Sequence, residues 1–192
     1  MLGSQFQQRP VMSLQTGTRI ATTSVPVINP GELKIVAYEV EGPLLAEKPA
    51  FLRTEEIREV APMGMIVDSA DDLVGIDDVI ALKKLYDLDF SLINIAVIDE
   101  HKKKLGKVED YTLETGSFVI QQLHVKRGFM KGITDTGLLI HRSQIIKITD
   151  TEIFVKSTAK KVSEPVTETT RGEFVNPFRA QNPQVEPLQS DR

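Results

Sequence analysis

The chain has 192 residues with a net charge of −4, an aromatic content of 6%, and neither cysteine nor tryptophan. These values exclude a disulfide framework, thiolate metal sites and a catalytic thiol, and the acidic balance argues against a strongly basic nucleic-acid binder. No run approaches the roughly 18 apolar residues of a membrane span, and we therefore expect a cytoplasmic protein. The chain length corresponds to one ordinary domain or two small ones.

Charge is distributed unevenly along the chain. Residues 1–88 carry a net charge of −5, residues 89–156 carry +1, and residues 157–192 are neutral. Any surface that binds anions is therefore expected in the second half of the chain.

Residues 8–75 have the composition of a small β domain. The run at 34–40 is rich in β-branched residues, and the sequence Asn-Pro-Gly at 29–31 supplies a tight turn before it. Short runs of this kind, bounded by turn residues, predict strands.

An acidic stretch follows this first domain. A calcium loop would need six to eight converging oxygens with spacing like Asp-x-Asp-x-Asp-Gly, and that spacing is absent. Two interpretations remain, a divalent-cation site and a solvated linker with helix caps, and the second is favoured. The carboxylates concerned are Asp68, Asp71, Asp72, Asp77 and Asp78.

Residues 76–88 predict a short linker helix. Apolar residues recur there at helical spacing, Asp77 or Asp78 can cap its start, and two lysines lie toward its negative end. We expect the apolar stripe to pack between the two halves of the chain and to stabilise both. This stripe consists of Val79, Leu82, Leu85 and Tyr86.

Residues 89–157 predict a second β domain. In the run at 118–125, strict alternation places Phe118 and Ile120 on one face of a strand and Leu123 and Val125 on the other.

The two domains are similar in sequence. Residues 20–40 align without gaps on residues 105–125, at an offset of 85, with the pair Gly31 and Gly116 in the same turn. Residues 53–60 and 65–67 align on 141–148 and 153–155 at an offset of 88, so a three-residue loop insertion separates the two blocks. This self-similarity predicts a duplicated fold.

The basic clusters lie in predicted turns of the second copy. They could contact the phosphates of RNA, or they could be charged hairpin tips that keep a small domain soluble; few aromatic residues accompany them, which favours the second interpretation. The candidate cations are Lys102, Lys103, Lys104, Lys126, Arg127 and Lys131.

No constellation in the sequence points to catalysis. His101, His124 and His141 are scattered singly, without metal-ligand spacing, and no glycine-rich phosphate loop is present. We expect no enzyme activity, no metal and no cofactor.

Residues 158–192 predict a flexible tail, because prolines and polar residues dominate there. Phe174, Val175 and Phe178 interrupt this polar composition. They could dock on a partner, or the segment could pack back on its own domain.

A family resemblance emerges from these patterns. The run Leu-Gly-Lys-Val-Glu-Asp-Tyr at 105–111, preceded by the strand at 96–99 and closed by the strand at 143–148, resembles the PRC-barrel domain. That domain occurs in the H subunit of the photosynthetic reaction centre and in the ribosome maturation factor RimM. The first copy resembles it less closely, since Ala21 replaces the glycine at 106.

The resemblance implies a mainly β protein with two small barrels in tandem. The first would span 8–75, the linker helix 76–88, the second barrel 89–157, and a disordered tail 158–192. It also implies a non-enzymatic role, and we expect a binding or scaffold module whose partner is a protein. The alternative is a ribosome-associated maturation factor that binds a ribosomal protein or rRNA.

Overall fold

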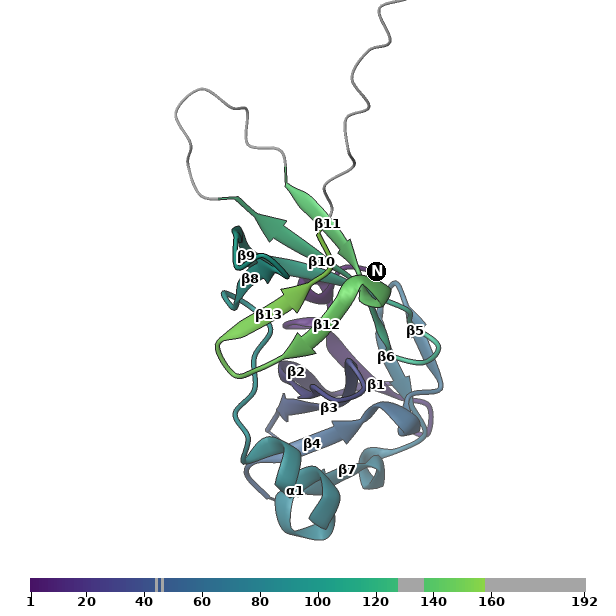
Figure 1. Cartoon of the computed structure of the whole chain (residues 1–192). Coiled ribbons are helices and arrows are strands. Elements are labelled where there is room, and N and C mark those ends of the chain that lie inside the picture. Colours follow the sequence, from purple (N-terminus) through teal and green to yellow (C-terminus); the bar gives the residue numbers. More distant parts are fainter. Residues whose placement is uncertain (44, 46, 128–136, 158–192) are drawn as a thin grey trace, which may run out of the picture. The chain divides into compact units, whose positions relative to one another are not determined.

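The computed structural model describes residues 1–43, 45, 47–127 and 137–157. Met1–Thr158 forms one compact unit, and its described residues form two β-sheets, one short α-helix and several 3₁₀ turns (Figure 1). The predicted mainly β class is confirmed. The tail at 158–192, with Phe174, Val175 and Phe178, and also Lys131, lies outside the described residues.

The first sheet is built from the first copy. Its strands are β1 (Pro10–Ser13), β2 (Arg19–Asn29), β3 (Lys34–Glu41), β4 (Ala50–Arg53), β5 (Glu59–Ala61), β6 (Gly64–Val67) and β7 (Leu73–Gly75). They are ordered β5-β6-β1-β2-β3-β4-β7. Short 3₁₀ turns precede or connect them: η1 (Gly3–Phe6), η2 (Thr54–Glu56), η3 (Ala70–Asp72) and η4 (Ile76–Asp78).

The second sheet follows the helix α1 (Ile80–Tyr86). Its strands are β8 (Ala96–Asp99), β9 (Lys104–Leu113), β10 (Ile120–Lys126), β11 (Leu138–His141), β12 (Ile145–Ile148) and β13 (Glu152–Val155), with η5 (Arg142–Gln144) between β11 and β12. They are ordered β11-β10-β9-β8-β13-β12. We call residues 1–87 the first lobe and residues 88–157 the second lobe.

The strand order demonstrates the duplication predicted from the sequence. Without β7, the order β5-β6-β1-β2-β3-β4 matches β12-β13-β8-β9-β10-β11 strand for strand. One pair in each lobe is parallel: β1 with β6 in the first lobe, and β8 with β13 in the second. All the other pairs of these strands are antiparallel. Among the described residues, no pairing joins β5 to β7 or β11 to β12.

Backbone conformation repeats with the same offsets. Residues with a side chain rarely adopt positive φ, because Cβ then crowds the backbone. Leu33 (φ 51°) and Phe118 (φ 56°) nevertheless share this conformation at an offset of 85, as do Gly17 (φ 67°) and Lys102 (φ 63°). Gln8 and Asn94 repeat it just before β1 and β8. The two copies therefore need the same turns even where their residues differ.

Strict alternation in β10 is wrong. Ile120, Leu123 and Val125 are all buried, although alternation would place Ile120 opposite the other two. The register against β9 shifts between Ile120 and Gln122 and again between His124 and Val125. A β-bulge inserts an extra residue and re-aims the side chains that follow it, which periodicity alone does not reveal.

One apolar core runs through both lobes. Phe6 and Tyr38 of the first lobe contact Phe118 of the second, with ring centroids 6.0 and 6.3 Å from it. On the same junction, η1 lies so close to the second lobe that a Cβ at Gly3 would fall 2.3 Å from the Tyr111 ring. The lobes therefore meet through fully buried aromatic side chains.

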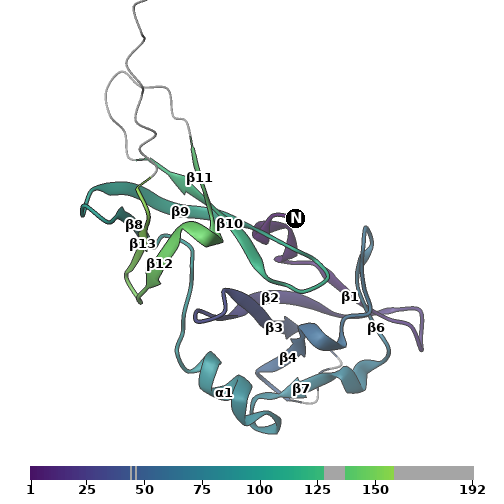
Figure 2. The ribbon, with the colours of Figure 1, turned by 45° about the vertical axis from the view of Figure 1, so that its right-hand side comes forward.

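The helix α1 packs on the first sheet and not among the aromatic residues of this junction. Leu82 packs with Val27, Ala37 and Phe51 of the first sheet, and Val79, Leu85 and Tyr86 border the same cluster. Both Figure 1 and Figure 2 show α1 beside the first sheet. The structure places the predicted stripe, Val79, Leu82, Leu85 and Tyr86, on the first sheet, and Leu85 and Tyr86 also line a cleft that borders the second lobe.

Candidate functional site

The junction between the lobes has an internal two-fold symmetry. Lys34 and Val119, equivalent residues of the two copies, form an antiparallel bridge. On either side, the Ile35 amide donates to the Phe118 carbonyl at 3.0 Å and the Ile120 amide donates to the Leu33 carbonyl at 2.8 Å. Ile35 corresponds to Ile120, and Leu33 to Phe118, so the two hydrogen bonds are equivalent by the symmetry of the duplication. This is the arrangement of a symmetric dimer interface within one chain.

A cleft of about 460 Å³ opens between the lobes, and we call it the junction cleft. It is lined by corresponding segments of the two copies: residues around 3–7 and 25–28 of the first lobe and residues 89–94 and 109–111 of the second. The lining residues that carry polar or aromatic side chains are Ser4, Gln7, Tyr86, Asp89, Phe90, Ser91, Asn94, Glu109, Asp110 and Tyr111.

The junction cleft is acidic. Asp89, Glu109 and Asp110 line it, and among the described residues no lysine, arginine or histidine does. Asp110 accepts hydrogen bonds from the amide and hydroxyl of Ser4, at 3.1 and 2.6 Å, and so anchors η1. Burial, and then the nearby carboxylates of Glu39, Asp89 and Asp87, raise the pKa of Tyr86. The phenol therefore stays neutral at the edge of a negative surface.

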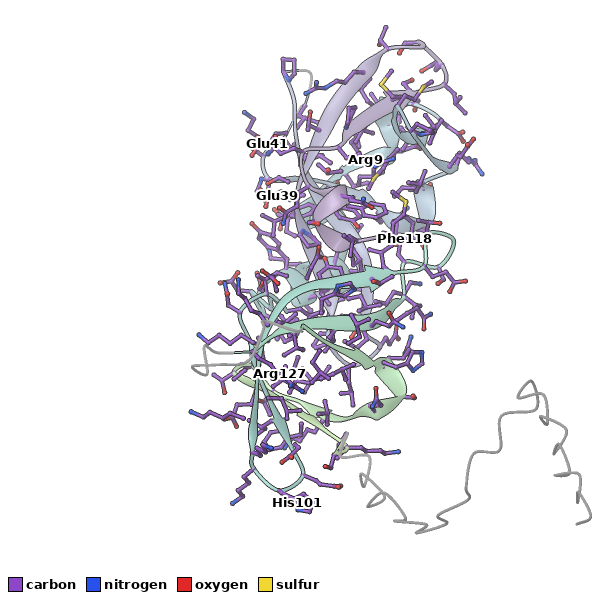
Figure 3. The ribbon with its side chains drawn as sticks, turned by 90° about the horizontal axis from the view of Figure 1, so that it is seen from above. Arg9, Glu39, Glu41, His101, Phe118 and Arg127 are labelled. Atoms are coloured by element: carbon purple, nitrogen blue, oxygen red, sulfur yellow. The ribbon has the colours of Figure 1, made fainter. Side chains whose placement is uncertain are left out.

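The predicted cations gather at one end of the second sheet. Lys102 and Lys103 lie in the β8–β9 turn, Lys104 begins β9, and Lys126 and Arg127 end β10; all are exposed. Figure 3 shows His101 at the tip of this turn and Arg127 along the strand behind it. We call Lys102, Lys103, Lys104, Lys107, Lys126 and Arg127 the basic end.

Two features of the basic end were not evident in the sequence. Lys107 belongs to it, because it pairs directly with Lys126 across β9 and β10. The buried carboxylate of Asp99 accepts hydrogen bonds from the amides of His101 and Lys103, each at 2.9 Å, and thereby shapes the turn that carries the lysines. An aspartate just before a polar turn is the local signal that indicates such a cap.

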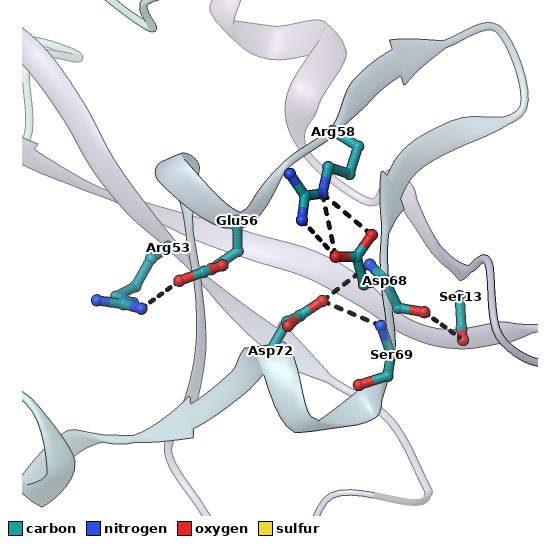
Figure 4. A network of polar contacts seen from close by, with 7 residues as sticks. All are labelled: Ser13, Arg53, Glu56, Arg58, Asp68, Ser69 and Asp72. Carbon is teal, nitrogen blue, oxygen red and sulfur yellow. Dashed lines mark hydrogen bonds and ion pairs between the residues drawn. The ribbon is translucent and has the colours of Figure 1, made fainter.

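The acidic stretch is used for caps and ion pairs (Figure 4). Asp68 accepts hydrogen bonds from Nε of Arg58 at 3.0 and 3.1 Å, and these bonds lower the pKa of its carboxyl. Asp72 accepts hydrogen bonds from the amides of Asp68 and Ser69 at 2.8 and 3.0 Å. Asp78 accepts one from the Gly75 amide at 2.8 Å.

These carboxylates therefore have local partners. Asp77 contributes another pair, with Nζ of Lys83 at 2.6 Å. Within the described ranges, no three His, Cys, Asp or Glu side chains are grouped so that they could hold a metal ion.

The histidines also make local contacts. His124 Nε2 lies 2.7 Å from the Thr112 hydroxyl across β9 and β10. His141 Nδ1 lies 2.8 Å from the Ser143 hydroxyl and accepts the Ser143 amide at the start of η5. His101 is exposed next to Glu100. The structure does not bring the three imidazoles together.

No protein-family model matches the chain, and no curated protein matches it either. In the described part of the chain, no helix combines the length and apolar character that crossing a membrane requires.

Proposed function

We propose that this protein is a non-catalytic binding module, in which two PRC-type barrels in tandem present one fixed surface to a partner protein. The observation that carries the proposal is the presence of an acidic cleft at the closely packed junction and of a basic end on the second lobe. Three carboxylates line the junction cleft and six cations lie at the basic end, and the two surfaces adjoin where Glu109 lies 3.5 Å from Lys126. Surfaces of complementary charge steer partners and fix their orientation.

The rigidity of the junction supports this proposal. Phe6, Tyr38 and Phe118 are at most 4% exposed, and the backbone pair at Lys34 and Val119 ties the sheets directly. Such packing keeps the two charged surfaces at a constant spacing. A partner that contacts both surfaces would bind a module that is already ordered, so binding would cost little conformational entropy.

The local use of polar side chains supports a non-catalytic role. Catalysis by a general base needs a second group that orients the base toward a substrate. His141, Asp99 and Asp72 instead hold backbone amides of their own turns. Their hydrogen-bonding capacity serves the fold.

The basic end favours a second candidate, a ribosome-associated assembly factor that contacts rRNA or a ribosomal protein. Six basic side chains lie there, compared with two neighbouring carboxylates, those of Glu100 and Glu109. Lys126 Nζ is already 3.5 Å from Glu109. Binding to a nucleic acid would release counterions and would therefore weaken steeply with salt.

Crosslinking of the full chain in cytosolic extract tests the proposal. We expect specific crosslinks to a protein, at low salt, that persist after ribonuclease treatment. Cosedimentation with small ribosomal subunits that is lost after charge reversal of Lys102, Lys103 and Lys104, but not of Lys84 on α1, would favour the second candidate. The absence of any specific partner at low salt would overturn both.

A further inference from the structure

We propose that the junction cleft receives a lysine or arginine side chain carried by an extended segment of the partner protein. This inference rests on the proposed binding function and names the chemistry of the partner. Two features of the cleft support this inference: its negative charge and its apolar lining.

The three carboxylates in the junction cleft are only partly neutralised by hydrogen bonds and ion pairs. Within the described residues, the carboxylate of Asp89 makes no hydrogen bond or ion pair, and that of Glu109 has only Lys126, at 3.5 Å. The third carboxylate, Asp110, keeps acceptor capacity beyond its bonds to Ser4 and to the Tyr111 amide. Three carboxylates lining one cleft repel one another and attract a cation.

Part of the cleft lining is apolar. Val25, which is 56% exposed, and Pro26 both line it. Tyr86 and Phe90 add aromatic rings to the lining. Lysine and arginine carry an aliphatic stem below a cationic head, and their heads also bind over aromatic rings. The cleft therefore matches both parts of such a side chain.

The duplication indicates that the charge of Glu109 is not needed for folding. Its position corresponds to Ser24 in the first copy, which makes the equivalent β-bulge without a carboxylate. Asp89 follows α1, outside the repeated strands. Both carboxylates are exposed, and among the described residues neither accepts a hydrogen bond from a backbone amide. Recognition of a cation explains their presence.

The occupant is one side chain on an extended segment rather than a folded surface. A volume of about 460 Å³ lies within the range of sites for small ligands. A protruding side chain fits such a cleft, while the main chain of the segment would lie along its rim near Val25.

The test is fluorescence anisotropy with the full chain at low salt. The probe is a fluorescein-labelled nonapeptide of alternating alanine and arginine, and its control replaces each arginine with citrulline, which is neutral and of nearly equal shape. We expect the arginine peptide to bind at least about tenfold more tightly than the citrulline peptide. Equal binding, or no binding of either peptide, would overturn the inference.

Variants then locate the binding site. The double variant Asp89→Asn with Glu109→Gln is expected to weaken arginine-peptide binding by about tenfold or more. The control is Glu41→Gln, which removes one exposed carboxylate at the end of β3 (Figure 3), a residue that does not line the cleft, and it should change affinity by less than about twofold. Equal weakening by both would show that only general charge is at work.

The crosslinking experiment separates this inference from the proposed function. If the double variant keeps the crosslinked partner at wild-type yield, the cleft is not the binding site although the module still binds. If the wild-type chain captures no partner, the proposed function fails, whatever the peptide does. The thermal midpoint of each variant, expected to be unchanged because these side chains are exposed, shows that it is folded.

Discussion

Lys34 and Val119 pair across the junction of the lobes, and each occupies the same position in its own copy. The flanking hydrogen bonds, Ile35 to Phe118 and Ile120 to Leu33, exchange with one another when the copies are exchanged. A symmetric backbone contact of this kind leaves the side chains free to differ. Aromatic Phe6 and Tyr38 in the first copy correspond to Leu92 and Leu123 in the second, and all four are buried.

Truncation of Phe118 should destabilise both lobes together. The side chain is 4% exposed and packs against Phe6 and Tyr38, so we expect Phe118→Ala to lower the free energy of unfolding by about 3–5 kcal/mol. Urea unfolding should show a single transition for the variant and for the wild type. The control Ile146→Ala, at a site that is 54% exposed, should change stability by less than about 0.5 kcal/mol. Two separate transitions, with only one displaced, would contradict a shared core.

Tyr38 should make the fold sensitive to alkali. Burial, and then Tyr111, raise its pKa far above the ordinary value of about 10, against an opposing effect of Arg9. The folded state thus holds the proton more tightly than the unfolded chain does. This stability is complete below about pH 10 and is lost as the pH rises toward the folded pKa, because the unfolded phenol ionises first.

The variant Tyr38→Phe isolates this effect. Its hydroxyl has no hydrogen-bond partner among the described residues, so the substitution should leave stability at pH 7 unchanged or raise it by about 1 kcal/mol. Urea titrations at pH 7 and at about pH 10.5 should show a smaller alkaline loss than in the wild type. A marked destabilisation at pH 7 would mean that the hydroxyl has a partner.

Gly17 tests the left-handed turn shared by the two copies. Its φ is 67°, and nothing lies within 4 Å of the position that a Cβ would occupy, so Gly17→Ala should cost only the conformational strain, about 1 kcal/mol. The control Gly116→Ala also has open space but no left-handed φ, and should be neutral or slightly stabilising. Thermal unfolding measures both. Equal effects would show that φ does not decide the outcome.

Leu82 tests the packing of α1. It is 4% exposed against Phe51 and Val27, so Leu82→Ala should lower the free energy of unfolding by about 2–5 kcal/mol. Ile80→Ala on the same helix, at a site that is 74% exposed, is the control and should change it by less than about 0.5 kcal/mol. Hydrogen exchange should report faster opening of α1 and of the β4 amides in the Leu82 variant. Wild-type protection in α1 would contradict this packing.

The sequence alone determined the duplication, the position of strands such as β3 and β8, and the basic turn. These depend on local properties: β-branched runs, turn residues at a constant offset, and three lysines in a row at 102–104. The pairs Leu33 and Phe118, and Gly17 and Lys102, occupy equivalent turns because the same strand order requires the same reversals of the chain.

Only the tertiary structure decided how the copies meet, what α1 covers and where the acidic cleft lies. The helical spacing showed which face of α1 is apolar, but the same face could cover either sheet. Asp89 lies in the turn after α1 and Glu109 lies in β9, twenty residues further along the chain, and neither differs locally from an ordinary surface carboxylate. They line one cleft because two copies of a sheet dock about an internal two-fold axis, and docking depends on contacts between residues that are distant in the chain.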